Sequence, residues 1–173
     1  MSNLTLRIAS GIALGAIMIC GLLVSKYLLA ALFIFMIIAM MLEFYRMAMG
    51  KRHLVSQILA VAAGVGGFAV LFSFFNWGLP IGFISFPIVL LMGVPVSAVF
   101  SKNREHMEDF AYILTGIIYI AIPLILSNII AFKGGEFNAI LLLCFFILIW
   151  SSDIGSYVIG MALGKGKKQM APD

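Results

Sequence analysis

The last long apolar run of the chain reads Cys144-Phe-Phe-Ile-Leu-Ile-Trp-Ser-Ser-Asp153-Ile-Gly-Ser-Tyr-Val-Ile-Gly-Met-Ala-Leu-Gly164-Lys-Gly-Lys-Lys168. It is apolar enough to lie in a bilayer, yet it carries one carboxylate, Asp153. A charged side chain near the middle of a membrane helix costs at least about 2.5–3.5 kcal/mol, so it is found mainly where it faces a protein interior or a wet cavity. The lysines that follow fall at the membrane surface, within reach of phosphate groups. The stretch predicts a membrane helix with part of a site for a metal ion and a phosphorylated substrate.

The composition of the whole chain agrees with a membrane protein. Of 173 residues, 64% are hydrophobic and 10% are charged, whereas soluble domains average about 25% charged residues. A soluble core of this size could not bury so much apolar surface. The net charge of +4 does not indicate nucleic-acid binding, because membrane topology explains its sign. Cys20 and Cys144 lie in apolar runs without a spaced Cys or His partner, and we expect them to be buried packing thiols.

Six apolar segments have the length of a membrane span, roughly 17–25 residues. We expect an all-α integral membrane protein with about six transmembrane helices in one polytopic domain over residues 1–173. The spans are expected near residues 8–24, 27–44, 57–75, 79–100, 110–132 and 138–163. Only Ser25 and Lys26 separate the first two spans, which should form a tight hairpin. The first span resembles a signal peptide but lacks a small-x-small cleavage site, so we expect it to be retained.

The basic residues orient these spans. With six spans, both termini and the second and fourth loops share one side, which holds nine of the lysines and arginines, and the other side holds two, Lys26 and Lys133. Positively charged loops stay in the cytoplasm. We therefore expect both termini to be cytoplasmic, in a multi-pass protein of the cell (inner) membrane.

Three other polar features have structural interpretations. Glu43 and Arg46 share one helical face and are expected to pair with each other. Asn128 is expected to bond to a neighbouring helix. The polar stretch 101–109 alternates in charge and is typical of a solvated loop. No catalytic role is expected for His53 or His106, because neither has an apolar wall or a fixed partner in view.

The residues around Asp153 define the expected chemistry. A carboxylate in a low-dielectric cleft is a suitable ligand for Mg²⁺, which binds one or two carboxylates together with substrate phosphates. Gly155 and Gly160 allow backbone to approach a ligand closely, and Tyr157 shares a helical face with Asp153 and can hydrogen-bond to it. With Ser152, these residues are expected to support a catalytic, metal-binding Asp153.

The lysines after the span are expected to bind substrate phosphates. Lys165, Lys167 and Lys168 supply mobile point charges for this purpose. The run from Gly160 to Gly166 is not a P-loop, because one residue is missing between the glycines and no Ser or Thr follows the lysine. The pairs Gly11-xxx-Gly15 and Gly160-xxx-Gly164 allow close helix approach and are compatible with a homodimer.

Residues 149–172 carry a resemblance to a known family. The segment Ile149-Trp-Ser-Ser-Asp-Ile-Gly-Ser-Tyr-Val-Ile-Gly-Met-Ala-Leu-Gly-Lys-Gly-Lys-Lys-Gln-Met-Ala-Pro172 resembles the central motif of bacterial phosphatidate cytidylyltransferases, or CDP-diacylglycerol synthases. Members typically read Asp-Thr-Gly-Ala-Tyr, then Gly, Gly-Lys-x-Lys and Ala-Pro. Here Ile154 replaces the Thr and Ser156 the Ala. Arg7 before the first span and Glu43-Phe-Tyr-Arg46 at the end of the second are also similar to that family.

The chain departs from the family pattern after this motif. A Ser-Pro-Lys-Lys segment and a later signature with Lys-Arg, Lys-Asp, His-Gly-Gly and Asp-Arg-x-Asp do not occur before Asp173. We therefore expect the amino-terminal part of such an enzyme, with half of a composite site and no activity alone.

The resemblance implies a reaction in phospholipid biosynthesis. CTP and phosphatidic acid would give CDP-diacylglycerol and pyrophosphate, with Mg²⁺ or another divalent cation neutralising phosphate charge. Asp153 would bind the metal, and the three lysines would bind phosphate oxygens. Partners would be CTP, phosphatidic acid and membrane lipids.

Two other functions fit the residues alone. An intramembrane acid in a glycine-containing helix can bind a cation or relay a proton, as in half of a cation- or proton-coupled transporter. In a non-catalytic membrane scaffold, Asp153 would hold helices together. Cation-dependent CTP turnover would separate the enzyme from both.

Overall fold

The computed structural model describes residues 15–99 and 109–164. Each regular element in these ranges is a helix, and this confirms the predicted all-α class. The elements are the helix Gly15–Val24, α2 (Lys26–Met49), α3 (Leu54–Trp77), η1 (Ile81–Ile84), α4 (Ser85–Val99), α5 (Asp109–Gly116), η2 (Ile117–Ala121), α6 (Ile122–Ala131) and α7 (Ala139–Gly164).

Four of the described helices are long and apolar enough to cross a membrane. They are α2, α3, the continuous span Asp109–Ala131 and α7. Two shorter apolar helices, Gly15–Val24 and Ile81–Ser97, fall in the first and fourth predicted spans. Each of the six predicted segments thus contains a helix, and the number that cross the bilayer stays a prediction.

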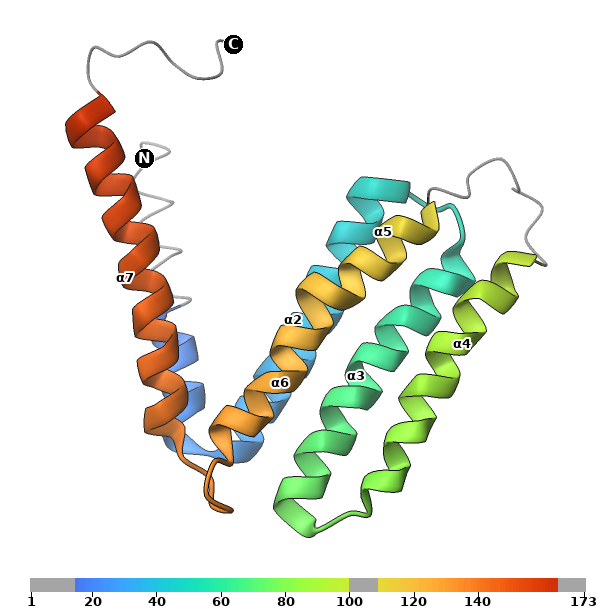
Figure 1. Cartoon of the computed structure of the whole chain (residues 1–173), viewed down its shortest axis with the longest axis horizontal. Helices are drawn as coiled ribbons and strands as arrows, with labels where there is room; N and C mark the ends of the chain where they lie inside the picture. Colours follow the sequence, from blue (N-terminus) through green and yellow to red (C-terminus); the bar gives the residue numbers. More distant parts are fainter. Residues whose placement is uncertain (1–14, 100–108, 165–173) are drawn as a thin grey trace.

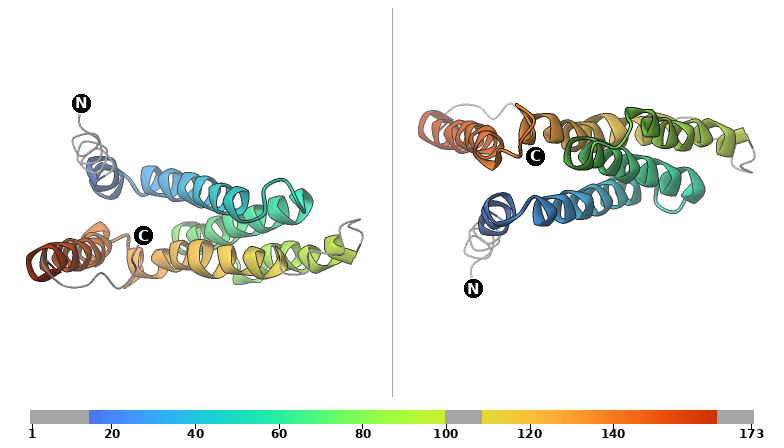
Figure 2. Two further views of the ribbon diagram at one scale, coloured as in Figure 1. Left: turned by 90° about the horizontal axis from the view of Figure 1, so that it is seen from above. Right: turned by 90° about the horizontal axis from the view of Figure 1, so that it is seen from below.

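The helices form two arms that meet at one end in a V (Figure 1). One arm is a bundle of α2, α3, α4 and the α5–α6 span. The other contains α7 and the helix Gly15–Val24, and the views from above and below show both outside the bundle (Figure 2). The chain turns sharply at Ser25, as predicted, but its first two helices diverge into different arms. They remain close near the turn, where a Cβ on Gly21 would lie 3.2 Å from Leu32 Cδ2.

Capping residues set the helix ends of the bundle. Ser25 Oγ accepts a hydrogen bond from Tyr27 N at the start of α2 (3.2 Å), which is a common N-cap interaction. Gly50 and Gly78 end α2 and α3 with φ angles of 62° and 66°, which glycine adopts without a steric penalty. The fourth span was predicted to begin at Leu79, but α4 begins at Ser85, because Pro80 and the short helix η1 complete the turn first.

Missing side chains allow the bundle helices to approach closely. A Cβ on Gly64 of α3 would lie 3.1 Å from Ala121 Cβ, and one on Gly67 would lie 3.0 Å from Ile125 Cδ1. Gly116 makes room for the buried ring of Tyr45, whose hydroxyl donates to the carbonyl oxygen of Ile113 (2.9 Å). These contacts fasten α2 and α3 to the α5–α6 span.

An aromatic cluster lies where the two arms meet. The Phe132 ring packs on those of Phe72 and Phe75, with centroids 5.7 and 5.6 Å away, and Tyr27 stacks on Trp77 at 6.4 Å. Such pairs contribute about 0.5–1.5 kcal/mol each beyond area burial. The cluster joins the ends of α3 and α6 to the start of α2.

The turn into α7 lies beside this cluster. Gly134 and Gly135 have φ angles of 95° and 89°, and Asn138 Oδ1 accepts from Ile140 N and Leu141 N at 3.1 and 3.2 Å. The glycines allow the reversal, and Asn138 caps the new helix.

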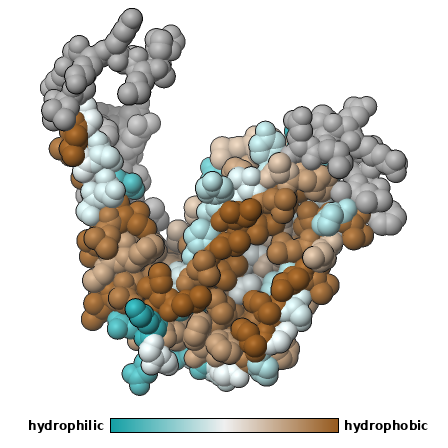
Figure 3. All heavy atoms as spheres, viewed as in Figure 1, coloured by the Kyte–Doolittle hydropathy of each residue, from teal (hydrophilic) through white to brown (hydrophobic). Residues whose placement is uncertain are grey.

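The structure corrects two expectations about side chains in the spans. Cys20 and Cys144 are free, as predicted, but exposed rather than buried. Asn128 is buried and donates to Ile125 O of its own helix (3.0 Å), not to a neighbouring helix. Apolar side chains cover much of the visible surface of both arms (Figure 3). An apolar residue on a membrane helix can remain exposed because it is surrounded by lipid rather than by water.

Candidate functional site

The central residue of the predicted site, Asp153, lies in the second half of α7 and its side chain is exposed. No described residue forms an ion pair with it. Ser152, Ile154 and Ser156 beside it on α7 are also exposed. The carboxylate is therefore free to bind a ligand, but the described residues do not enclose it.

The supporting residues on α7 leave open space around it. A Cβ on Gly155 or Gly160 would meet nothing within 4 Å. Ser156 Oγ donates to the carbonyl oxygens of Ser152 and Asp153, both at 2.9 Å, so its hydroxyl is engaged by the helix. Ser152 itself is exposed. This part of α7 thus presents a small-residue surface beside one carboxylate.

The side chains of the remaining predicted site residues lie outside the part of the chain that the structure describes. Lys165, Lys167 and Lys168 lie outside the described residues, and so does the side chain of Tyr157, although its backbone belongs to α7. The predicted hydrogen bond between Tyr157 and Asp153 and the phosphate-binding role of the lysines stay predictions.

The described residues fit a Mg²⁺ site only in part. Mg²⁺ binds one or two carboxylates and completes its shell with water and phosphate oxygens, and the unpaired Asp153 suits one such position. Within the described ranges, no group of three His, Cys, Asp or Glu side chains could hold a metal ion. Any metal at Asp153 would need ligands from the substrate or from residues beyond those described.

A second carboxylate, Asp109, forms a buried ionic cluster that the sequence interpretation missed. It is the first residue of α5 and its side chain is 3% exposed. Arg52 Nη2 donates to Oδ1 (3.2 Å), and Arg52 Nε lies 3.1 Å from Oδ2. The contact ties the α2–α3 turn to the start of α5, where a negative charge also favours the helix dipole. Asp109 is therefore not part of a solvated loop.

His53 belongs to the same cluster. Its side chain is 2% exposed, with Nε2 3.7 Å from Asp109 Oδ2 and its ring centroid 5.2 Å from that of Phe110. It thus lies against an apolar wall and near a carboxylate, although neither ring nitrogen has a hydrogen-bond partner among the described residues. The sequence did not reveal these surroundings. Gln57 Nε2 donates to the carbonyl oxygens of Arg52 and Gly50 (2.7 and 3.2 Å). The sequence contained one indication of this cluster. The predicted topology places Arg52, His53 and Asp109 on the same side of the membrane.

Glu43 and Arg46 do not form the predicted ion pair. Both side chains are exposed on α2, and the ion pairs among the described residues involve Asp109 only. An exposed pair of this kind contributes only about 0.3–0.5 kcal/mol, which does not suffice to hold two long side chains in one geometry. With Leu42 and Met47, they line a hollow on the outer face of α2.

Comparison with protein-family models assigns the chain to a family. The model described as "Cytidylyltransferase family" matches residues 5–173. Comparisons with curated proteins and with solved structures gave no match. The matched range covers nearly the whole chain, including α7 and the lysines after it. The chain therefore belongs to the cytidylyltransferase family, the family of the CDP-diacylglycerol synthases.

Proposed function

We propose that the protein acts as a phosphatidate cytidylyltransferase, in which CTP and phosphatidic acid give CDP-diacylglycerol and pyrophosphate. Family membership supports nucleotidyltransferase activity and CTP binding. The observation that favours a lipid acceptor is the position of Asp153, an unpaired carboxylate about 15 Å along α7 from Leu163. A reacting group at that depth in an apolar helix suits an acceptor that lies in the bilayer.

The proposed reaction is one displacement at phosphorus. A phosphate oxygen of phosphatidic acid attacks the α-phosphorus of CTP, the bond from that phosphorus to the oxygen bridging to the β-phosphate breaks, and pyrophosphate leaves. Mg²⁺, when bound, supplies charge neutralisation on the phosphates. Asp153 would hold it, while Lys165, Lys167 and Lys168 would bind phosphate oxygens as point charges.

The other residues of the site would have supporting roles. Gly155 and Gly160 leave room for the substrates, and Ser152 and Tyr157 would donate hydrogen bonds. Because the described residues offer no complete metal site, we propose that further carboxylates come from outside them, either from another part of the protein or from a second copy in a homodimer. The first of these alternatives is the composite site expected from the sequence.

The orientation of the protein is part of the proposal. If the α2–α3 turn is cytoplasmic, CTP reaches the end of α7 from the cytoplasm and the lipid arrives from the inner leaflet. In a Cys20→Ser/Cys144→Ser background, an impermeant thiol reagent added outside intact cells should label Lys133→Cys and not Lys102→Cys. The reverse pattern would contradict the orientation.

The activity is tested in vesicles with the complete gene product. Pyrophosphate should be released only when CTP, phosphatidic acid and Mg²⁺ are all present, with CDP-diacylglycerol formed in equal amount. Lys167→Ala and Lys168→Ala should raise KM more than they lower kcat, while Lys133→Ala, in the turn before α7, serves as the matched control. Pyrophosphate release without phosphatidic acid would exclude the proposed acceptor.

A further inference from the structure

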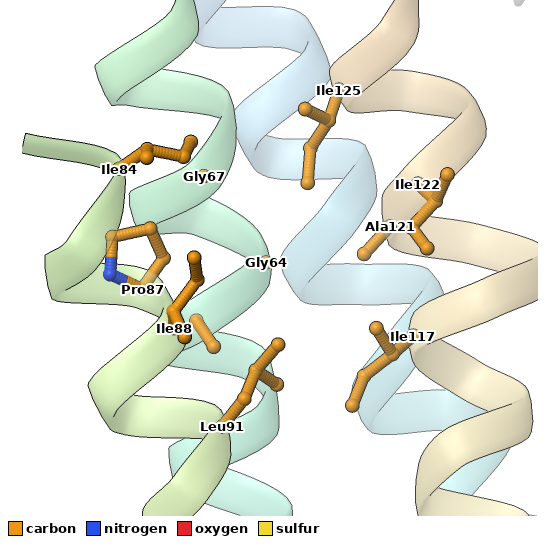
Figure 4. Close-up of a pocket in the computed structure, with 11 residues that line it drawn as sticks. Gly64, Gly67, Ile84, Pro87, Ile88, Leu91, Ile117, Ala121, Ile122 and Ile125 are labelled. Carbon is orange, nitrogen blue, oxygen red and sulfur yellow. The ribbon is translucent and has the colours of Figure 1, made fainter. Parts of the chain in front are cut away.

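One cavity of the bundle plays no part in the proposed site. It is a crevice of about 150 Å³ between α3, α4 and the α5–α6 span, and each residue that lines it is apolar (Figure 4). Gly64 and Gly67 form its floor on α3. Ile88 and Leu91 of α4 line one wall, and Ile117 and Ile122 line the other. We call this cavity the α3 crevice.

Two local features border the α3 crevice. Gly64 and Gly67 give it a backbone floor on α3, close to the opposite helix: a Cβ on them would lie 3.1 Å from Ala121 Cβ and 3.0 Å from Ile125 Cδ1. Across from them, residues Ile117–Ala121 form a π-helical turn inside an otherwise α-helical span. Such turns are rare, occur mostly as single-turn bulges inside α-helices and are frequent at functional sites. The π turn supplies Ile117 and Ala121 to the lining.

The α3 crevice is continuous with the lipid-facing surface of the bundle. Ile88 and Ile122, one from each wall, are 48% and 39% exposed. Ile117 and Ile125 lie about 12 Å and 24 Å along the helix from Asp109, at 1.5 Å per residue. With Asp109 at the membrane surface and a hydrocarbon core about 30 Å thick, these distances put the crevice across the middle of the bilayer, where the methyl ends of lipid acyl chains lie.

The chemistry of the lining selects the occupant. Water needs two to four polar partners in a cavity, and the lining side chains offer none. An empty hollow would forfeit dispersion contacts on every side. A cavity of about 150 Å³ with similar lining in a soluble protein stays dry and binds benzene, so this one has room for about six carbons of a chain.

We infer that the α3 crevice binds the methyl-terminal end of a fatty acyl chain from a bilayer glycerophospholipid. The inference does not rest on the proposed function, because a lipid can occupy the crevice whether or not it is a substrate. The competing occupant is an apolar helix of a second copy of this chain, and the experiment distinguishes the two.

The test uses the full chain in vesicles that contain phosphatidylcholine with a photoreactive diazirine at the methyl end of one acyl chain. After photolysis, mass spectrometry should find Ile88, Leu91 and Ile122 labelled about fivefold more than Ile118, which is 55% exposed but does not line the crevice. The same lipid with its diazirine beside the ester should lose this preference. Equal labelling of Ile118 and Leu91 would show bulk lipid contact only and would overturn the inference.

Filling the crevice gives a second measurement. Ile88→Phe and Ile122→Phe replace partly exposed side chains, so they should insert normally, and each should lower labelling of Leu91 about fivefold. Ile118→Phe is the matched control and should leave it unchanged. Unaltered labelling in the filled variants, or cross-links between Leu91 and a second copy of the chain, would also overturn the inference. The unmodified protein with the two lipids decides the question if a variant fails to fold.

Discussion

Asp109 and Asp153 are both carboxylates on apolar helices, and the structure treats them in opposite ways. Asp109 is buried at the start of α5 and bound by Arg52. Asp153 is exposed on α7, and no described residue pairs with it. Their helices differ in the same sense, because far more residues are buried in the span Asp109–Ala131 than in α7.

This difference predicts which residues contribute to the stability of the fold and which contribute to function. In the bundle, Asp109 is bound by Arg52, so its removal should weaken the fold. On α7, the hydroxyl groups of Ser151 and Ser156 bond only within the helix, and Asp153 has no ion-pair partner among the described residues. Removal of the Asp153 charge should therefore leave the fold intact and affect only what binds there. Substitutions on the two sides of this comparison should therefore change different measurements.

The largest expected effect is loss of turnover in Asp153→Asn. The substitution keeps the shape of the side chain and removes the charge that would hold the metal, so CDP-diacylglycerol formation by the complete gene product should fall about 10³-fold or more. Unfolding temperature in detergent should not fall, because an exposed, unpaired charge is lost. Glu136→Gln, which removes a carboxylate from the turn before α7, is the control and should retain activity. Wild-type turnover in Asp153→Asn at saturating Mg²⁺ would refute the metal role.

Asp109→Asn should show the opposite pattern. Breaking a buried ion pair costs about 3–5 kcal/mol, and the partial exposure of Arg52 reduces this to about 2–3 kcal/mol. The free energy of unfolding should therefore drop, measured by thermal or denaturant unfolding in detergent. Arg52→Gln should lower it by a similar amount, and the double variant by less than the sum. Additive losses would show that the two residues do not form one unit.

Substitutions of two glycines test whether the bundle is more tightly packed than α7. A Cβ on Gly116 would lie 2.6 Å from the Tyr45 ring, whereas one on Gly155 would meet open space. Gly116→Ala should cost about 1–3 kcal/mol of unfolding free energy through overpacking. Gly155→Ala should be neutral or stabilise the helix by up to about 1 kcal/mol. Equal losses of unfolding free energy in the two variants would contradict the difference in packing between α5 and α7.

The smallest effect is expected for the exposed charges on α2. Because Glu43 has no ion-pair partner among the described residues, Glu43→Gln should change the free energy of unfolding by no more than about 0.5 kcal/mol. Arg46→Gln should be equally mild, and unfolding in detergent measures both. A loss above about 1.5 kcal/mol in either variant would reveal a stabilising contact for that side chain.

Much of the fold could be predicted because membrane helices follow local rules. A run of apolar residues must satisfy its own backbone hydrogen bonds in lipid, so its length and composition suffice to indicate a helix. The turn at Ser25 was visible in the same way. The start of α4 was placed too early, because hydropathy does not register how Pro80 and the short helix η1 use part of the apolar run for a turn.

The site was harder to predict, and for a different reason. Asp153 stood out because a carboxylate in an apolar run has a cost that can be estimated without a structure, and its motif carried the family resemblance. Asp109 did not stand out, because its partners Arg52 and His53 lie far away in the sequence and its polar neighbours suggested a solvated loop. The exposed positions of Cys20 and Cys144 were missed because an apolar neighbourhood in sequence does not reveal which side of a helix meets lipid.

The sequence by itself determined the class of protein, the approximate helices, the family and the single carboxylate of α7, since each depends on residues close together in the chain. Only the tertiary structure decided which polar groups are paired, which helix stands apart from the bundle and where the α3 crevice lies. Those features depend on distances between helices, and these are set by small side chains such as Gly64 and Gly116, whose partners lie about 50–70 residues away in the sequence. Contacts of that kind arise when the bundle packs, and no local pattern specifies them.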